Sequence, residues 1–215
     1  MASRSLEKGN AACEAVQAAG IKGKVSSIQL DVTDQSSIAA AVKQVEADHG
    51  RLDVLVNNAG VSSKAPTLKE SLEATFNTNV MGAALVAEAF TPLLLKSPNA
   101  YLLHVSSGLG SLTLASDASR FDYGIDARAY RMSKAALNML MMQDAKTLGK
   151  QGVKVFAFCP GLVESNLRGE SEMERTMGGK AGSPEVSGRT ILKIIEGERQ
   201  ADVGKFVHEG GVYPW

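Results

Sequence analysis

The sequence of 215 residues contains only two cysteines, Cys13 and Cys159, and they form no CxxC pair. A disulfide scaffold needs more cysteines, and thiolate metal sites need them closely spaced. The three histidines, His49, His104 and His208, are scattered along the chain, so we expect no metal site. Two isolated thiols are typical of small core residues in a reducing compartment, and we place the protein in the cytoplasm.

An excess of charge and a long hydrophobic run are also lacking. The 23 basic side chains balance the 23 acidic ones, so composition gives no reason to expect nucleic acid or an anionic membrane as a partner. The longest apolar stretch, residues 85–95, is interrupted by Glu88 and Pro92. A membrane-spanning helix needs roughly 18 apolar residues or more. We therefore expect a globular protein that binds neither nucleic acid nor membrane.

A regular alternation of helical and strand patterns runs through the chain. Helix starts are marked by capping residues: Asp34, the pair Thr67 and Glu70, and Ser183 ahead of Pro184. Helices are expected over residues 6–19, 34–48, 67–95 and 127–149 and from 183 onward, and strands over residues 25–30, 52–56, 100–106, 153–158 and 203–207. The run 52–56 is nearly all apolar, which is typical of a strand buried on both faces of a sheet. The alternation predicts a single α/β domain with a doubly wound, Rossmann-like parallel sheet.

One component of such a fold is missing from the start of the chain. A doubly wound sheet normally begins with a strand, a Gly-rich turn and a helix whose N-terminus binds phosphate. No G-x-x-x-G-x-G or G-x-G-x-x-G pattern stands near residue 1. We therefore expect residues 1–215 to form one domain that is N-terminally incomplete.

Polar and turn-forming residues stand at the ends of the expected strands, where α/β folds bind their ligands. They are Asp31, the run Asn57-Asn58-Ala59-Gly60, the pair Ser106-Ser107 and the pair Pro160-Gly161. Each of these features taken alone also fits an ordinary loop or turn. Their common position at strand ends is what points to a binding site.

Tyr130 and Lys134 lie on the helix that follows the Ser106-Ser107 strand. Their spacing of four residues places both side chains on one helix face, about one turn apart. An ammonium beside a phenol favours the phenolate, so we expect the pKa of Tyr130 to move down from its usual value near 10. A phenol tuned in this way can exchange a proton with a carbonyl or alcohol oxygen. The Ser107 hydroxyl could hydrogen-bond the same oxygen.

The combination resembles the short-chain dehydrogenases/reductases over nearly the whole chain. The motifs that carry the resemblance, in sequence order, are Asp31-Val32, Asn57 to Gly60, Asn79, Ser107, Tyr130-x-x-Ser133-Lys134 and Pro160-Gly161. The resemblance implies four catalytic residues. Tyr130 would be the general acid and base, Lys134 would lower its pKa, Ser107 would orient the substrate carbonyl, and Asn79 would hold a water in a proton relay.

The resemblance also implies NADP as the cofactor and a set of residues that bind it. Beyond Tyr130 and Lys134, which would hold the nicotinamide ribose, the set comprises Arg4, Asp31, Asn57, Ala59, Gly60, Pro160, Gly161, Val163 and Ser165. Arg4 would pair with the 2′-phosphate of NADP, and Asp31 would accept a hydrogen bond from the adenine. Val163 and Ser165 would contact the nicotinamide carboxamide. Relative to the family, the first strand, the Gly-rich turn and the first helix are missing, which would leave backbone groups and apolar surface exposed on the neighbouring strands.

The expected activity is that of an oxidoreductase that moves a hydride between NADP(H) and a small carbonyl or alcohol substrate. Ser107 and Tyr130 are 23 positions apart, whereas the family more often separates them by about a dozen. The longer spacing resembles carbonyl-reductase-like members, in which a segment such as 116–126 borders the substrate pocket. The helix that carries Tyr130 would support a homo-oligomer. The alternative function is that of a truncated, non-catalytic member acting as a binding or dimerisation partner.

Overall fold

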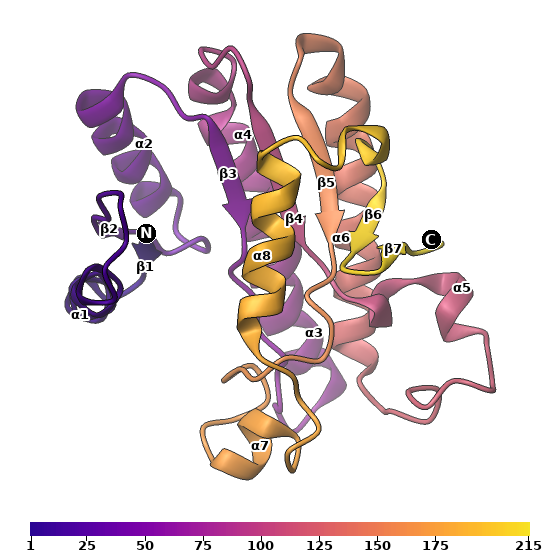
Figure 1. Ribbon diagram of the computed structural model, residues 1–215. Helices are drawn as coiled ribbons and strands as arrows, with labels where there is room; N and C mark the ends of the chain where they lie inside the picture. The colour runs from indigo at the N-terminus through magenta and orange to yellow at the C-terminus, as the bar shows by residue number, and fades with distance from the viewer.

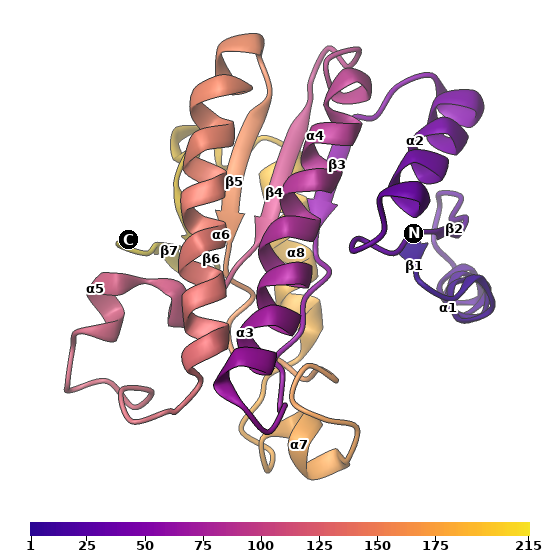
Figure 2. The same ribbon diagram turned by 180° about the vertical axis from the view of Figure 1, so that it is seen from behind.

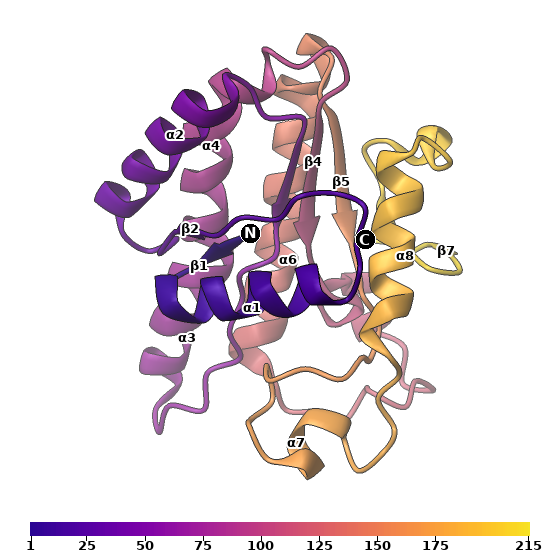
Figure 3. The same cartoon turned by 60° about the vertical axis from the view of Figure 1, so that its left-hand side comes forward.

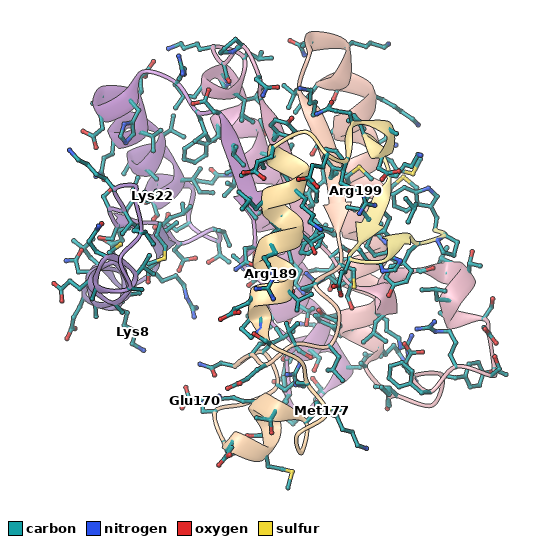
Figure 4. The ribbon with its side chains drawn as sticks, in the orientation of Figure 1. Lys8, Lys22, Glu170, Met177, Arg189 and Arg199 are labelled. Atoms are coloured by element: carbon teal, nitrogen blue, oxygen red, sulfur yellow. The ribbon has the colours of Figure 1, made fainter.

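Five hydrogen-bonded strands form the central sheet, in the order β3-β4-β5-β6-β7, in a computed structural model that describes residues 1–215. Their bounds are β3 (Val54–Asn57), β4 (Tyr101–Val105), β5 (Lys154–Phe158), β6 (Phe206–His208) and β7 (Gly211–Val212). Neighbouring strands run parallel from β3 to β6, and only β7 is antiparallel to its partner. Arg199, labelled in Figure 4, holds this last hairpin by donating to the His208 and Gly211 carbonyls. The predicted single α/β domain with a parallel sheet is confirmed.

Helices cover both faces of the sheet (Figures 1 and 2). The face seen in Figure 1 carries α8 (Pro184–Ile195), and the opposite face carries α3 (Leu68–Phe76), α4 (Ala83–Leu94) and α6 (Arg128–Thr147). Ile194 of α8 packs with Leu103 and Phe156, while Met141 of α6 packs with Leu102 on the other face. Burial of each such side chain contributes about 1.5–3 kcal/mol. Apolar residues that alternate along the strands therefore hold the helices on the two faces of the sheet. None of the helices is both long and apolar enough to span a membrane.

Most helix boundaries follow from the capping residues. The helices α1 (Leu6–Ala18) and α2 (Gln35–His49) lie within a residue or two of their expected ranges. Asp34 caps α2 by accepting a hydrogen bond from the Ser36 backbone N–H, and Ser183 caps α8 in the same way from Glu185. The short elements α5 (Leu112–Ala115), α7 (Glu172–Thr176), η2 (Gly108–Gly110), η3 (Gly149–Gln151) and η4 (Gln200–Asp202) were not expected. They are too short to leave a periodic signal.

The long helix expected over 67–95 contains a change of helix type. Its capping box of Thr67 and Glu70 is confirmed. Between α3 and α4, however, residues Asn77–Gly82 form a π-helical segment, η1. A π segment inserts an extra residue per turn and shifts the side chains that follow, which is why such segments often occur at functional sites.

The last expected strand begins later than predicted. The expectation was 203–207, whereas β6 starts at Phe206. Gly204 adopts a left-handed conformation with φ +79° and turns the chain ahead of the strand.

The sheet is divided, because the first two strands pair only with each other. The strands β1 (Ala2–Ser3) and β2 (Ile28–Gln29) are parallel and lie between α1 and α2 (Figure 3). This unit is held to the rest through α2, whose Ile38 and Ala41 pack against Phe90 of α4. No strand joins β1 to β3.

The edge of β3 that faces β1 is open. The Asp53 carbonyl accepts from the Tyr101 N–H of β4, so Asp53 and Leu55 turn their backbone groups to β4. Backbone groups alternate along a strand, so Val54 and Val56 turn theirs to the open edge. The strand is half-buried, whereas β4 and β5 are almost entirely buried. Both faces of 52–56 are packed, as expected, with Val54 and Val56 against the α8 face and Leu55 against the other, but the side chains are only half-buried because the strand has a neighbour on one edge only.

We predict that amide hydrogen exchange will report this open edge. The Val54 and Val56 amides should exchange at least about 100-fold faster than the Leu55 amide, which is directed at β4. Leu55 is the internal control, since it belongs to the same strand. Equal protection of all three amides, measured by NMR, would show that the edge is covered in solution.

Candidate active site

Tyr130 and Lys134 lie one turn apart on α6, against the carboxyl end of β4. The Lys134 Nζ atom donates a hydrogen bond to the Val105 carbonyl at 2.8 Å and lies 5.6 Å from the centre of the Tyr130 ring. The lysine side chain is buried, with 4% of the residue exposed. The structure therefore brings together the phenol and the amine that the sequence singles out, with the amine buried and the phenol half-buried.

Burial sets the pKa values of this pair. Desolvation raises the pKa of Tyr130 to about 12, an effect that the hydrogen bond with the Ser107 side chain only partly opposes. Desolvation also lowers the pKa of Lys134 to about 8. The expected lowering of the phenol's pKa is therefore wrong for this structure, because burial outweighs the opposing effects of the Ser107 hydrogen bond and the Arg168 charge. At neutral pH the phenol carries its proton.

Ser107 lies at the start of η2, directly after β4. Its Oγ atom accepts a hydrogen bond from the Leu109 N–H at 3.3 Å and is a partner of the Tyr130 phenol. The η2 turn lies against α6 because Gly110 has no side chain there. A Cβ atom on Gly110 would lie 2.6 Å from the Lys134 carbonyl carbon, closer than real contacts allow. A glycine at this position lets the serine turn and the Tyr130 helix approach each other.

Cys159 links two loops of the site, and sequence reasoning missed this role. The thiol is buried at the end of β5. Its Sγ atom accepts hydrogen bonds from the Gly108 N–H at 3.2 Å and the Gly161 N–H at 3.4 Å. It thereby ties the loop after Ser107 to the Pro160-Gly161 turn. Desolvation raises the pKa of this thiol, which keeps it neutral.

Asn79 lies in the π-helical segment η1 and is fully buried. Its Oδ1 atom accepts from the Val61 N–H at 2.8 Å, and its Nδ2 atom donates to the Val61 carbonyl at 2.9 Å and to the Ser133 hydroxyl at 3.0 Å. The side chain thus connects the loop after β3 to the turn of α6 between Tyr130 and Lys134. The proton-relay role expected for Asn79 stays a prediction.

Five of the expected cofactor residues meet in one cavity of about 550 Å³ between β1 and β3. They are Arg4, Asp31, Asn57, Ala59 and Gly60. Side-chain and backbone hydrogen bonds from Thr33 lower the pKa of Asp31, so its carboxylate is charged at neutral pH. Gly60 brings this cavity close to Tyr130 and Lys134, since a Cβ atom added to Gly60 would lie 3.5 Å from the Lys134 Nζ atom.

Pro160, Gly161, Val163 and Ser165 lie outside that cavity. They begin a segment, residues 160–183, that contains α7 and carries Glu170 and Met177 (Figure 4). Val163 forms an isolated bridge with Gly182, and the Ser165 Oγ atom accepts from the Leu167 N–H. The structure therefore does not place these four residues beside the first five.

An ion pair joins this segment to the loop after β3. Glu174 of α7 lies 2.5 Å from the Lys64 Nζ atom. The hydrogen bonds from Lys64 and Ser171 lower the pKa of Glu174 to about 2. The Glu174 side chain is partly exposed to solvent, and its partner lies 110 residues away in the sequence.

The long connection between Ser107 and Tyr130 packs against the C-terminal residues. The Trp215 carbonyl accepts from the Thr113 N–H, and the Pro214 carbonyl accepts from the Ser111 hydroxyl. Phe121, at the outer part of the connection, is 82% exposed. The expected inserted segment is thus anchored at one end and exposed at its tip, beside the N-terminal end of α6 (Figure 1).

Comparisons with known proteins agree with one another. Residues 1–176 match the family described as short chain dehydrogenase. A short-chain dehydrogenase/reductase of Aspergillus fumigatus is 42% identical over 242 aligned positions, covering 100% of this chain and 86% of the relative. One of Talaromyces stipitatus is 36% identical over 210, covering 89% of this chain and 77% of the relative. The structure of NADPH-bound carbonyl reductase from chicken fatty liver superimposes with a TM-score of 0.81 at 29% identity, covering 100% of this chain and 86% of that one.

Burial of the Lys134 ammonium gives a prediction for stability against pH. The pKa of this lysine is about 8 in the folded protein and 10.5 for the free group. The destabilising contribution of the buried charge therefore has its full size below pH 8. Replacing Lys134 with Met should therefore stabilise the protein at pH 7, by about 1–3 kcal/mol after loss of the bond to Val105. The advantage should shrink as the pH rises from about 8 to 10.5. Urea unfolding at several pH values measures both effects, and a variant less stable than the parent at pH 7 would contradict them.

Proposed function

The chain belongs to the short-chain dehydrogenase family, and we propose that within it the protein transfers a hydride between NADP(H) and a carbonyl or alcohol substrate, with Tyr130 as general acid and base. One observation carries the proposal: a half-buried, protonated phenol has the Ser107 hydroxyl close enough to lower its pKa and Lys134 one turn away. These groups lie at the carboxyl ends of parallel strands, where α/β folds hold their ligands.

In the reductive direction each residue has a distinct task. The phenol, with its pKa at about 12, holds the proton that the carbonyl oxygen needs. Ser107 donates a hydrogen bond to the same oxygen and so stabilises the negative charge that develops there. The Lys134 ammonium stabilises the phenolate that remains after proton transfer, and Asn79 supports the path by which the proton is replaced. NADPH supplies the hydride when it is bound.

The residues around the cavity between β1 and β3 suit an adenine dinucleotide. Asp31 provides a charged acceptor for the adenine amine, and the small residues Ala59 and Gly60 allow a ligand close to the backbone. Asn57 borders the same space, while Lys134 would hold the nicotinamide ribose. Pro160 and Gly161 would border the nicotinamide, with Val163 and Ser165 meeting its carboxamide.

Arg4 favours NADP over NAD. Its side chain is exposed and lines the cavity that Asp31 borders. A guanidinium can pair with a 2′-phosphate through two parallel hydrogen bonds, whereas NAD-preferring sites place a carboxylate on that ribose. The structural neighbour that binds NADPH supports the same choice.

The substrate that we propose is a small carbonyl or alcohol compound of the kind that a carbonyl-reductase-like member would reduce or oxidise. The long connection between Ser107 and Tyr130 stands beside the catalytic pair and would border the pocket. A homo-oligomer formed through α6 and a cytoplasmic location belong to the same proposal, the latter supported by the two unpaired thiols.

The open edge of β3 favours a second candidate function. A parallel sheet whose edge strand has unpaired backbone groups can bind an extended segment of another chain through main-chain hydrogen bonds. A member of the family that is non-catalytic would then serve as a binding or dimerisation partner. Partner binding in the absence of any NADPH binding is the outcome that would favour this function.

The role of Tyr130 is tested by replacing it with Phe. Loss of the phenolic proton should lower kcat roughly 10²–10⁴-fold, because general acid catalysis contributes about that much. NADPH affinity, measured by fluorescence titration, should fall by no more than about tenfold, since Phe keeps the ring and loses at most one hydrogen bond to the ribose. Tyr123, which is exposed, gives the matched control in Tyr123→Phe, and its kcat should not change. Unchanged turnover in Tyr130→Phe would refute the mechanism.

The same titrations should be run on two forms, the chain as it stands and a chain with a Gly-rich strand–turn–helix segment joined ahead of residue 1. Tighter NADPH binding by the extended form would agree with the enzyme proposal, because such a turn adds donors for the pyrophosphate. NADPH binding by neither form would contradict it.

The preference for NADP is tested separately with Arg4→Ala. Removing the guanidinium should weaken NADPH binding roughly 10–100-fold, since a hydrogen-bonded charge pair contributes about 1.5–3 kcal/mol. NADH binding should not change, as it has no 2′-phosphate. Lys8→Ala on the exposed face of α1 controls for net charge (Figure 4). Equal losses for NADPH and NADH would argue against the assignment.

A further inference from the structure

His104 is a buried titratable residue that the proposed reaction does not use. It lies on β4, in the middle of the sheet, and is fully buried. Its ring nitrogens contact two other elements. The Nε2 atom lies 2.9 Å from Asp144 Oδ2 on α6, and the Nδ1 atom lies 3.4 Å from Asn57 Nδ2 at the end of β3. A single ring therefore connects the Tyr130 helix to a residue of the cofactor cavity.

The orientation of the Asn57 amide is imposed by its surroundings. Its Nδ2 atom donates to the Ala83 carbonyl at 3.0 Å, at the start of α4. A flipped amide would set Oδ1 against that carbonyl oxygen, and two acceptors repel each other. The amide nitrogen must therefore face both the Ala83 carbonyl and the His104 ring, and its two hydrogens serve these two partners.

This orientation decides the tautomer of His104. Because Asn57 donates to Nδ1, that nitrogen must carry a lone pair, and the proton of the neutral ring must be on Nε2. The Nε2–H group then donates to the Asp144 carboxylate, which is the partner found there. A ring protonated on both nitrogens would set one N–H group against another. Hydrogen bonds are thus donated in one direction along the chain, from Asn57 to His104 and from His104 to Asp144.

The consequence reaches the cavity between β1 and β3. Both donors of the Asn57 amide are used inside the protein, which leaves Oδ1 as its uncommitted polar atom on a residue that lines the cavity. Asn57 can offer a ligand an acceptor and no donor. We propose that the Asp144–His104–Asn57 chain makes His104 a positioning residue, which takes the second hydrogen of the Asn57 amide and, together with the Ala83 carbonyl, holds Asn57 as an acceptor for a hydrogen-bond donor of the bound dinucleotide. This inference rests on the proposed function for its ligand.

The proposal is tested first without any ligand, through the tautomer. Two-bond ¹H–¹⁵N correlation spectra of the histidine-labelled protein at neutral pH should show His104 as the Nε2–H form. An Nδ1–H form or a doubly protonated ring would overturn the chain of donors and acceptors, whatever the protein does with NADPH.

The second test separates positioning from stability. His104→Leu removes both contacts and should weaken NADPH binding about tenfold or more, which corresponds to one lost hydrogen bond of about 1.4 kcal/mol. His104→Gln keeps one acceptor and one donor and should restore the affinity to within about threefold. The kcat at saturating NADPH should be the same for both variants, because the ring touches neither Tyr130 nor Ser107.

Two further variants keep the test decisive where His104→Leu does not fold. Asp144→Leu removes the acceptor at the partly exposed end of the chain, while Asp144→Asn keeps an acceptor oxygen. The Leu variant should weaken NADPH binding, because the Nε2–H group loses its acceptor and the His104 ring is no longer held against Asn57, and the Asn variant should not. Parental affinity in a folded Leu variant would overturn the positioning role. Absence of NADPH binding by the parent would refute the proposed function and leave the tautomer test standing.

Discussion

The burial of Lys134 and the partial burial of Tyr130 are the constraint on which the proposed chemistry of this protein depends. Burial penalises the charged form of each group, so the pKa of the phenol rises to about 12 and that of the amine falls to about 8. The phenol is therefore protonated at neutral pH, and the amine retains much of its charge. Burial alone makes the phenol a weaker acid, so the release of its proton in the proposed reaction would depend on groups that stabilise the phenolate. The Lys134 ammonium, one helix turn away, and the Ser107 hydroxyl are the groups placed to do so.

Close packing of three segments against α6 buries the Lys134 side chain. Gly110 lets the serine turn reach the backbone of Lys134, and Gly60 brings the loop after β3 to its amine. Asn79 connects that loop to α6, and its place in the π-helical segment aims its amide at Val61 and Ser133 together. Cys159 closes the remaining side by holding the loops that follow β4 and β5. Each of these residues acts on the site through contacts between elements that are distant in sequence.

The separation of these contacts along the sequence explains which features could be predicted and which could not. Capping signals such as Thr67 with Glu70 act within one turn, so the sequence located the helices, and strand ends located Ser107 and Asp31. The direction of the Tyr130 pKa could not be foreseen, because a four-residue spacing reports a neighbouring amine and not the burial of both groups. The Asp144–His104–Asn57 chain could not be predicted for the same reason, since the two partners of His104 lie 40 and 47 residues away in the sequence. The roles assigned to the site residues remain predictions, whereas the family and the α/β fold are confirmed.

The division of the sheet links cofactor binding to the stability of the fold. The cavity of about 550 Å³ is lined by Arg4 on the β1 side and by Ala59 and Gly60 on the β3 side, so a ligand there would contact both parts of the sheet. In the protein alone these parts are joined chiefly by the packing of α2 on α4. A ligand that binds only the joined arrangement stabilises it by RT ln(1 + [L]/Kd), about 2.7 kcal/mol at a concentration 100 times Kd. An extended segment bound at the open edge of β3 would join the same two parts. Consider a segment that binds this edge and leaves the cofactor cavity free. The segment and a dinucleotide both favour the arrangement in which β1 and β3 are held at a fixed separation. By linkage, each would therefore bind more tightly in the presence of the other.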